Sequence, residues 1–157
     1  MKKSIILIAI IIIFISIIFL IIFNKNIQLS KEIINYCDKQ KEDIFELKLS
    51  DYTKFEWDNV IIYKNTISNK ELSEFLGIDY KKGLDLKSGM IFIKDNKIVY
   101  EEYFKTDFES PYKFVIYPYE DINSKNKINK FTKEKSVFKV ERIKYNNENR
   151  YKLTPIE

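Results

Sequence analysis

Histidine is absent from this chain of 157 residues, cysteine occurs once, and glycine and proline occur three times each. Histidine is the side chain that most readily exchanges a proton near neutral pH, so its absence excludes nucleophiles activated by histidine and histidine-based zinc sites. A single cysteine, Cys37, permits neither an internal disulfide nor a cysteine-rich metal site. We therefore expect no cofactor, no metal and no enzymatic activity, and we expect Cys37 to be a small buried apolar side chain.

The remaining candidates for chemistry are weak. Gly77, Gly83 and Gly89 are spaced by six residues, which matches neither a phosphate-binding loop nor a dinucleotide-binding loop. Glu101 and Glu102 are adjacent on an expected strand, so they point to opposite faces and do not share a site. An enzyme that works through carboxylates alone stays open as a third hypothesis, after two binding hypotheses.

A long apolar run extends from Ile5 to Phe23 and is interrupted only by Ala9 and Ser16. A helix that crosses a hydrocarbon core of about 30 Å needs roughly 20 apolar residues, and no charge lies within the run. The sequence therefore predicts a transmembrane signal-anchor helix at residues 1–24, which inserts in the lipid bilayer through Ile5 to Phe23. A single domain is expected to follow at residues 25–157.

A cleaved secretory signal is the alternative, because Lys2 and Lys3 resemble its basic leader. The run is longer than the usual 7–15 residues, and no small-residue cleavage pattern follows Phe23. We favour an uncleaved anchor in the plasma membrane, with the N-terminus in the cytoplasm and the domain outside, because long domains translocate largely regardless of charge.

The domain is expected to be α+β, with helices packed on one side of a mostly antiparallel sheet. The sequence predicts a helix from an N-cap at Ser30 to about Gln40, and a helix at residues 69–76 with a capping box and a left-handed Gly77. The buried stripe of the second helix is expected to be Leu72, Phe75 and Leu76. Strands are predicted at residues 44–49, 57–63, 90–94, 97–104, 112–117, 136–145 and 150–154, and a loop at 123–132.

Two strands flank Asp95 and Asn96, a dipeptide typical of a tight hairpin turn. In the expected register Ile93 faces Ile98 and Ile91 faces Tyr100. The strand at 57–63 carries consecutive apolar residues, so we expect it to lie centrally with both faces covered.

A binding surface is the functional hypothesis for two groups of residues. Trp57 and Asp58 either line the edge of a binding groove or, as we favour, form a core side chain and a strand-start hydrogen-bond acceptor. A basic stretch follows, which either is a solvated face or contacts anionic lipid or an anionic polymer of the envelope. Its candidate residues are Lys125, Lys127, Lys130, Lys133 and Lys135. Nucleic acid is not expected, because the net charge is +4 and Lys2, Lys3 and Lys25 account for most of it.

The segment from Phe55 to Tyr63, with Trp57-Asp58 inside it, and the capped helix that ends in Leu76-Gly77 carry a resemblance. The chain resembles an uncharacterised group of small bacterial membrane-anchored or exported proteins, in which an F-x-W-D strand precedes such a helix. It departs from that group at Lys64-Asn65-Thr66, where Pro-Tyr is usual. The resemblance implies the layout and no activity.

Together these observations predict a single-pass membrane-anchored, non-catalytic extracytoplasmic protein that binds another envelope component. The alternative is an anchored inhibitor or immunity protein directed against a secreted toxin or hydrolase.

Overall fold

The computed structural model describes residues 28–64, 66–84, 87–104, 114–116, 127–145 and 147–156. The apolar run from Ile5 to Phe23 and the candidate Lys125 lie outside these ranges, so the transmembrane helix stays a prediction. In the described ranges, none of the helices has the length and apolar character needed to cross a bilayer.

The described residues form two α-helices, a short 3-10 helix and eight strands. In chain order these are α2 (Leu29–Lys39), β1 (Ile44–Lys48), η1 (Leu49–Asp51), β2 (Asn59–Tyr63), α3 (Asn69–Leu76), β3 (Ser88–Lys94), β4 (Lys97–Phe104), β5 (Phe114–Ile116), β6 (Ile128–Thr132), β7 (Val137–Tyr145) and β8 (Glu148–Pro155).

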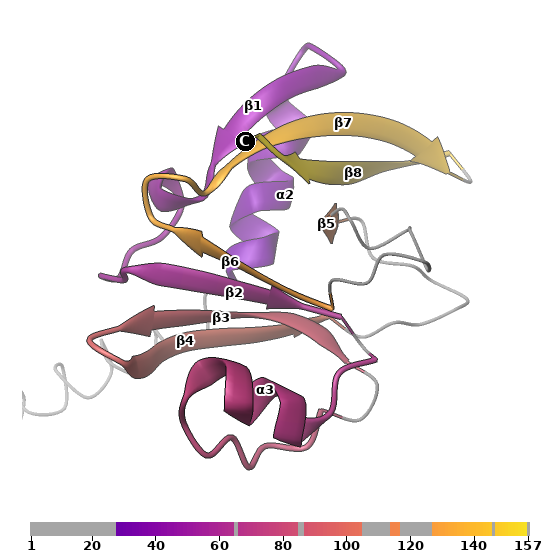
Figure 1. Cartoon of the computed structure of the whole chain (residues 1–157). Helices are drawn as coiled ribbons and strands as arrows, with labels where there is room; N and C mark the ends of the chain where they lie inside the picture. The colour runs from indigo at the N-terminus through magenta and orange to yellow at the C-terminus, as the bar shows by residue number, and fades with distance from the viewer. Residues whose placement is uncertain are drawn as a thin grey trace, which may run out of the picture.

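The strands form two sheets, where one sheet was expected. Sheet A has the order β1-β7-β8-β5 and sheet B the order β4-β3-β2-β6. Their pairs are antiparallel except that β5 runs parallel to β8. The α+β class is confirmed, but the helices do not share one side: α2 packs against both sheets, and α3 covers the opposite face of sheet B (Figure 1).

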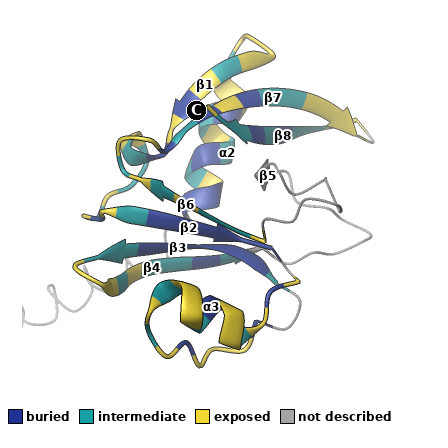
Figure 2. Ribbon diagram, in the orientation of Figure 1, coloured by how far each residue is buried: buried dark blue, intermediate teal, exposed yellow. Residues whose placement is uncertain are grey.

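The larger core lies between α2 and the two sheets. It contains buried side chains from α2, from β1, β7 and β8 of sheet A, and from β2 and β3 of sheet B (Figure 2). Cys37 of α2 is 0% exposed within this core, which confirms the expected role as a buried apolar residue. Burial, followed by the neighbouring Asp38 carboxylate, raises the pKa of its thiol to about 12.

The smaller core lies between sheet B and α3. Strand β2 contributes to both cores: Val60 and Ile62 point into the larger one, and Ile61 and Tyr63 into the smaller one. This confirms that β2 is central with both faces covered. It begins at Asn59, two residues later than predicted.

Helix α3 forms as its sequence predicts. Ser68 and Glu71 make a reciprocal capping box, and Gly77 ends the helix with φ of 69°. Leu72 is fully buried, but Phe75 is 46% exposed, so its assignment to the buried stripe is wrong. Tyr80 and Leu84 of the following loop pack with Leu72 in the smaller core, and Phe75 is not part of that core.

The β3–β4 turn has positive φ angles at Asp95 and Asn96, as a type I′ hairpin requires. Ile93 pairs with Ile98 as expected, but Tyr100 pairs with Phe92, because the register shifts between Phe92 and Ile93. Such an irregularity adds one residue to one strand and moves the remaining partners by one position. As predicted, Glu101 and Glu102 contact opposite sides of sheet B.

The predicted loop at residues 123–132 is wrong for its second half, which forms β6 and pairs with β2. The chain then turns at residues 133–135 and enters sheet A as β7. In the last hairpin β8 begins at Glu148, two residues before its predicted start.

Candidate functional site

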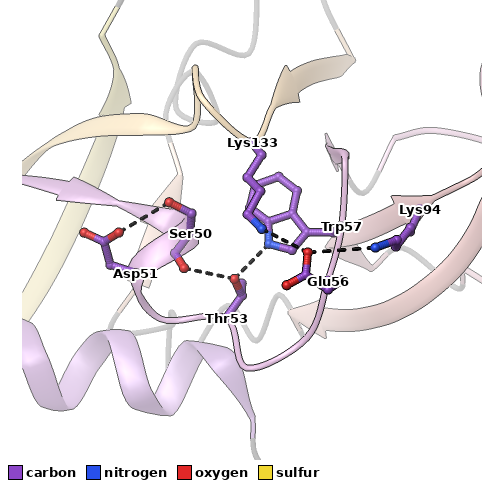
Figure 3. A network of polar contacts seen from close by, with 7 residues as sticks. All are labelled: Ser50, Asp51, Thr53, Glu56, Trp57, Lys94 and Lys133. Atoms are coloured by element: carbon purple, nitrogen blue, oxygen red, sulfur yellow. Dashed lines mark hydrogen bonds and ion pairs between the residues drawn. The ribbon is translucent and has the colours of Figure 1, made fainter.

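Trp57 lies in the larger core rather than at a surface groove. Its side chain is 2% exposed and packs edge-on against Phe92, with ring centroids 5.0 Å apart. The indole Nε1–H donates to the hydroxyl of Thr53 at 2.8 Å (Figure 3). The one polar atom of the indole is therefore bonded inside the protein, and the ring is not available to a ligand at the surface.

Asp58 is exposed, but its groups hold other segments in place. Its carboxylate accepts a hydrogen bond from the backbone N–H of Asp95 at 2.9 Å. Its backbone N–H donates to the carbonyl of Ile93, and its carbonyl accepts from the N–H of Lys133. Asp58 thus connects the start of β2 to the β3–β4 turn and to the turn between the two sheets.

The lysines of the candidate basic surface are partly neutralised. Lys127 lies 3.0 Å from the carboxylate of Glu71. Figure 3 shows the second pair, in which Lys133 lies 3.4 Å from the carboxylate of Glu56. Lys130 on β6 and Lys135 in the following turn are exposed. The described part of this surface is therefore a mixture of both signs rather than a uniformly basic patch.

The carboxyl of Glu71 has its pKa lowered to about 2. The largest cause is the hydrogen bond from the backbone N–H of Ser68 in the capping box, followed by the hydrogen bond from Lys127. Lys127 therefore pairs with the carboxylate that caps the N-terminus of α3.

The first turn of α2 is bonded to β4. Glu102 is only 7% exposed, and its carboxylate accepts from the backbone N–H of Ser30 at 3.2 Å and from the Ser30 hydroxyl. Tyr100 donates its hydroxyl to Glu102 at 2.9 Å and accepts from the N–H of Leu29 at 3.1 Å. Ser30 was expected to be the N-cap, but α2 begins at Leu29 and a distant carboxylate takes that role.

The last turn of α2 is bonded to sheet A. The guanidinium of Arg142 on β7 donates to the carbonyl oxygens of Cys37 at 3.1 Å and Gln40 at 2.6 Å. Its other terminal nitrogen donates to the carboxylate of Asp43 at 2.9 Å. A cation at the C-terminus and a carboxylate at the N-terminus both match the helix dipole, so α2 is capped at each end by a different sheet.

A polar cluster lies on the α3 side of sheet B. The hydroxyls of Tyr80 and Tyr103 lie 2.7 Å apart, and Tyr80 donates to Glu101 at 3.2 Å. Lys82 is ion-paired with the same carboxylate. The hydroxyls of Tyr80 and Tyr103, the carboxylate of Glu101 and the ammonium of Lys82 therefore have their polar partners within this cluster. Among the described residues, no group of three or more acidic or cysteine side chains is placed to hold a metal ion.

Exposed side chains of types common at binding interfaces lie on the β7–β8 hairpin, which projects at one end of sheet A (Figures 1 and 2). Ile143 is 43% and Tyr145 48% exposed. Arg150 faces Ile143 across the hairpin, and its guanidinium carbon lies 3.6 Å from the centroid of the Tyr145 ring. We call Ile143, Tyr145 and Arg150 the hairpin face.

Arg150 has no carboxylate partner within the described part of the chain, and its Nε–H is buried without a hydrogen bond. Elsewhere on the same side of the sheet, Lys139 and Lys152 lie 2.7 Å and 3.8 Å from the carboxylate of Glu141. Sequence reasoning missed the hairpin face. The signal that could have revealed it is the two-residue period of the strand. This period places Ile143 and Tyr145 on the face opposite to the core residues Phe138 and Val140.

The chain matches no protein-family model, no curated protein and no solved structure. The resemblance to small exported bacterial proteins therefore stays a prediction.

Proposed function

We propose that this protein is a membrane-tethered, non-catalytic extracytoplasmic domain that binds another component of the cell envelope through its hairpin face. The observation that carries the proposal is the capping of α2 at both ends, because α2 is the first described element after the apolar run. Because α2 is bonded to both sheets, it would connect a membrane-spanning helix firmly to both parts of the larger core.

The short connection supports a domain held near the bilayer. From Phe23 to Gln28 an extended chain spans at most about 18 Å, at about 3.6 Å per residue. The first turn of α2, beside β4, would therefore lie close to the end of a membrane-spanning run. Helix α2 rises about 16 Å along its length, at 1.5 Å per residue. Its far end is held by Arg142, so sheet A and the hairpin face belong to the end farther from the tether.

The composition of the hairpin face supports binding. Tyrosine and arginine are enriched among residues that dominate binding energy at protein interfaces. Tyr145 and Arg150 are already stacked, so less side-chain entropy is lost when a partner arrives. Because the Arg150 guanidinium has no carboxylate partner among the described residues, a protein surface that supplies a carboxylate is a favourable partner.

A lipid or polyanion surface built from the basic stretch is less well supported. Lys127 and Lys133 have carboxylate partners within the domain. Each of these pairs would have to be broken or shared when the lysine met a phosphate.

The tether is tested by fractionation and by adding protease to intact cells that produce the full chain with a C-terminal tag. We expect the tag in the membrane fraction and accessible to the protease. Recovery of the full-length chain in the soluble fraction, or a protected tag, would contradict the proposal.

The binding surface is tested by cross-linking in whole envelopes with Tyr145→Ser/Arg150→Gln. The matched control is Phe75→Ser, which changes an exposed aromatic residue on α3, far from sheet A in the fold. We expect a specific cross-linked partner that the hairpin variant loses and the control retains, with equal chain levels. A partner that survives the hairpin substitutions refutes the hairpin face as the binding surface. An enzyme among the partners that is inhibited by the chain would identify the inhibitor class.

A further inference from the structure

Strand β1 is an edge strand of sheet A. Among the described strands it pairs only with β7, and it lies at the outer margin of the sheet (Figure 1). Ile44, its first residue, is 60% exposed. An edge strand offers a row of N–H and C=O groups to a further strand.

The hydrogen bonds to β7 identify which residues of β1 offer these groups. The N–H of Arg142 donates to the carbonyl of Asp43 at 2.7 Å, and the N–H of Leu49 donates to that of Ser136 at 2.9 Å. Successive residues of an antiparallel strand bond alternately to one side and the other. Since Asp43 and Leu49 bond toward β7, the residues Ile44, Glu46 and Lys48 direct their backbone groups to the open edge.

We propose that this edge pairs with β1 of a second copy of the chain, antiparallel about a twofold axis that passes beside Leu47. Glu46 then lies opposite the partner's Lys48, and Lys48 lies opposite the partner's Glu46. Both are hydrogen-bonded pairs, because Glu46 and Lys48 direct their backbone groups outward. The two charge pairs lie on the solvent side of one sheet that continues across both copies.

Other registers are less favourable. An axis at Glu46 places this carboxylate opposite its own copy, and like charges directly opposite destabilise a strand pair. An axis at Phe45 places Ile44 opposite the partner's Glu46, so an apolar side chain faces a charge. The order Glu-Leu-Lys therefore selects the axis at Leu47. Such an interface uses the same surface on both copies and closes at a dimer.

The paired stretch is short, from Glu46 to Lys48, so the dimer depends on a high local concentration of the chain. Confinement to a bilayer supplies that concentration, and in this respect the inference rests on the proposed tether. The opposing interpretation is that Glu46 and Lys48 only protect the edge from pairing.

Cysteine cross-linking in membranes separates these cases. Opposite residues of a hydrogen-bonded pair have Cα atoms about 5.5 Å apart, within the range of about 4.4–6.8 Å that a disulfide spans. We expect Glu46→Cys/Lys48→Cys to form a covalent dimer on mild oxidation. Each single variant should stay monomeric, as should the unsubstituted chain, whose one cysteine is buried.

The outcomes are distinguishable. Cross-linking by Glu46→Cys alone, or no cross-link in membranes that contain the double variant, overturns the inference and leaves the tether intact. A chain absent from membranes contradicts the tether instead, and the cross-link is then measured on the concentrated purified full chain, where its absence overturns the dimer.

A charge exchange provides a second, independent readout. Glu46→Lys places a lysine opposite the partner's Lys48, so we expect the dimer fraction in lipid bilayers to fall about five-fold in single-molecule photobleaching. Glu46→Lys/Lys48→Glu restores opposite charges and should restore the dimer. Glu148→Lys, an exposed substitution on β8, is the matched control and should have no effect. An unchanged Glu46→Lys variant, or an exchange that restores nothing, overturns the inference.

Discussion

Replacing Glu102 by glutamine should destabilise the protein through its effect on α2. The substitution keeps the shape of the side chain and removes its charge. In the native protein three donors, the Ser30 N–H, the Ser30 hydroxyl and the Tyr100 hydroxyl, converge on one carboxylate that is 7% exposed. Glutamine offers one acceptor oxygen and turns an NH₂ group toward at least one of these donors.

The expected loss of stability follows from the hydrogen bonds that the Glu102 carboxylate accepts. A hydrogen bond to a charged group contributes about 1.5–3 kcal/mol, and a partly buried charge at a helix terminus contributes up to about 2 kcal/mol. Glutamine retains part of the bonding and is cheaper to bury than a carboxylate, which offsets some of the loss. We expect the free energy of unfolding to fall by about 2 kcal/mol, which lowers the Tm by about 6–10 °C for a domain of this size.

Three measurements check this. Urea unfolding of the full chain in detergent micelles gives the change in free energy, with Glu148→Gln as an exposed control that should stay within about 0.5 kcal/mol of the native protein. Hydrogen exchange should quicken first at the amides of the first turn of α2. A double-mutant cycle with Ser30→Ala should give a coupling of about 1 kcal/mol or more. Equal stability of Glu102→Gln and Glu148→Gln, or additive effects in the cycle, would refute the reasoning.

Five further outcomes are expected. Arg142→Met leaves the carbonyls of Cys37 and Gln40 without their donor, so urea unfolding should show a loss of about 3 kcal/mol; a loss below 0.5 kcal/mol contradicts the C-terminal cap. Gly89→Ala brings a Cβ within 2.6 Å of the Glu102 carbonyl oxygen and the Tyr63 hydroxyl oxygen, and should cost about 2–3 kcal/mol. Gly77→Ala, in open space at φ of 69°, should cost only about 1 kcal/mol. The pKa of Glu71 is lowered from 4.5 to about 2, so its contribution to stability is present above pH 4.5 and lost as the pH falls toward 2; an NMR titration with a midpoint near 4.5 contradicts this. Because the pKa of the Cys37 thiol is raised to about 12, a thiol reagent at pH 8 should modify it only after unfolding, and rapid labelling of the folded chain would show that this site is open.

Features encoded over a few residues were predictable from the sequence. The capping box of Ser68 and Glu71 and the turn at Asp95 and Asn96 formed as expected, because all their partners lie within four residues. Strand β6 was missed because its side chains are polar or partly exposed, and its position depends on backbone bonds to β2.

Contacts between distant residues were not predictable. Serine is a common N-cap residue, which is why Ser30 was predicted to cap α2. Instead the carboxylate of Glu102, which is 72 positions away, accepts the hydrogen bonds of the first helical turn. Likewise Lys127 and Lys133 were counted as a basic surface, although carboxylates 56 and 77 positions away pair with them. The count of lysines along the sequence therefore overestimated the positive charge of the surface. The hairpin face was not predicted because its residues come together only when β7 pairs with β8.

The placement of Trp57 makes the protein its own spectroscopic reporter. The chain contains no other tryptophan, and this one lies where residues of both sheets and α2 pack together. Its fluorescence emission should be blue-shifted in the native state and move toward the red when water reaches the indole. Excited selectively near 295 nm, it can follow loosening of the larger core in intact membranes without any attached dye.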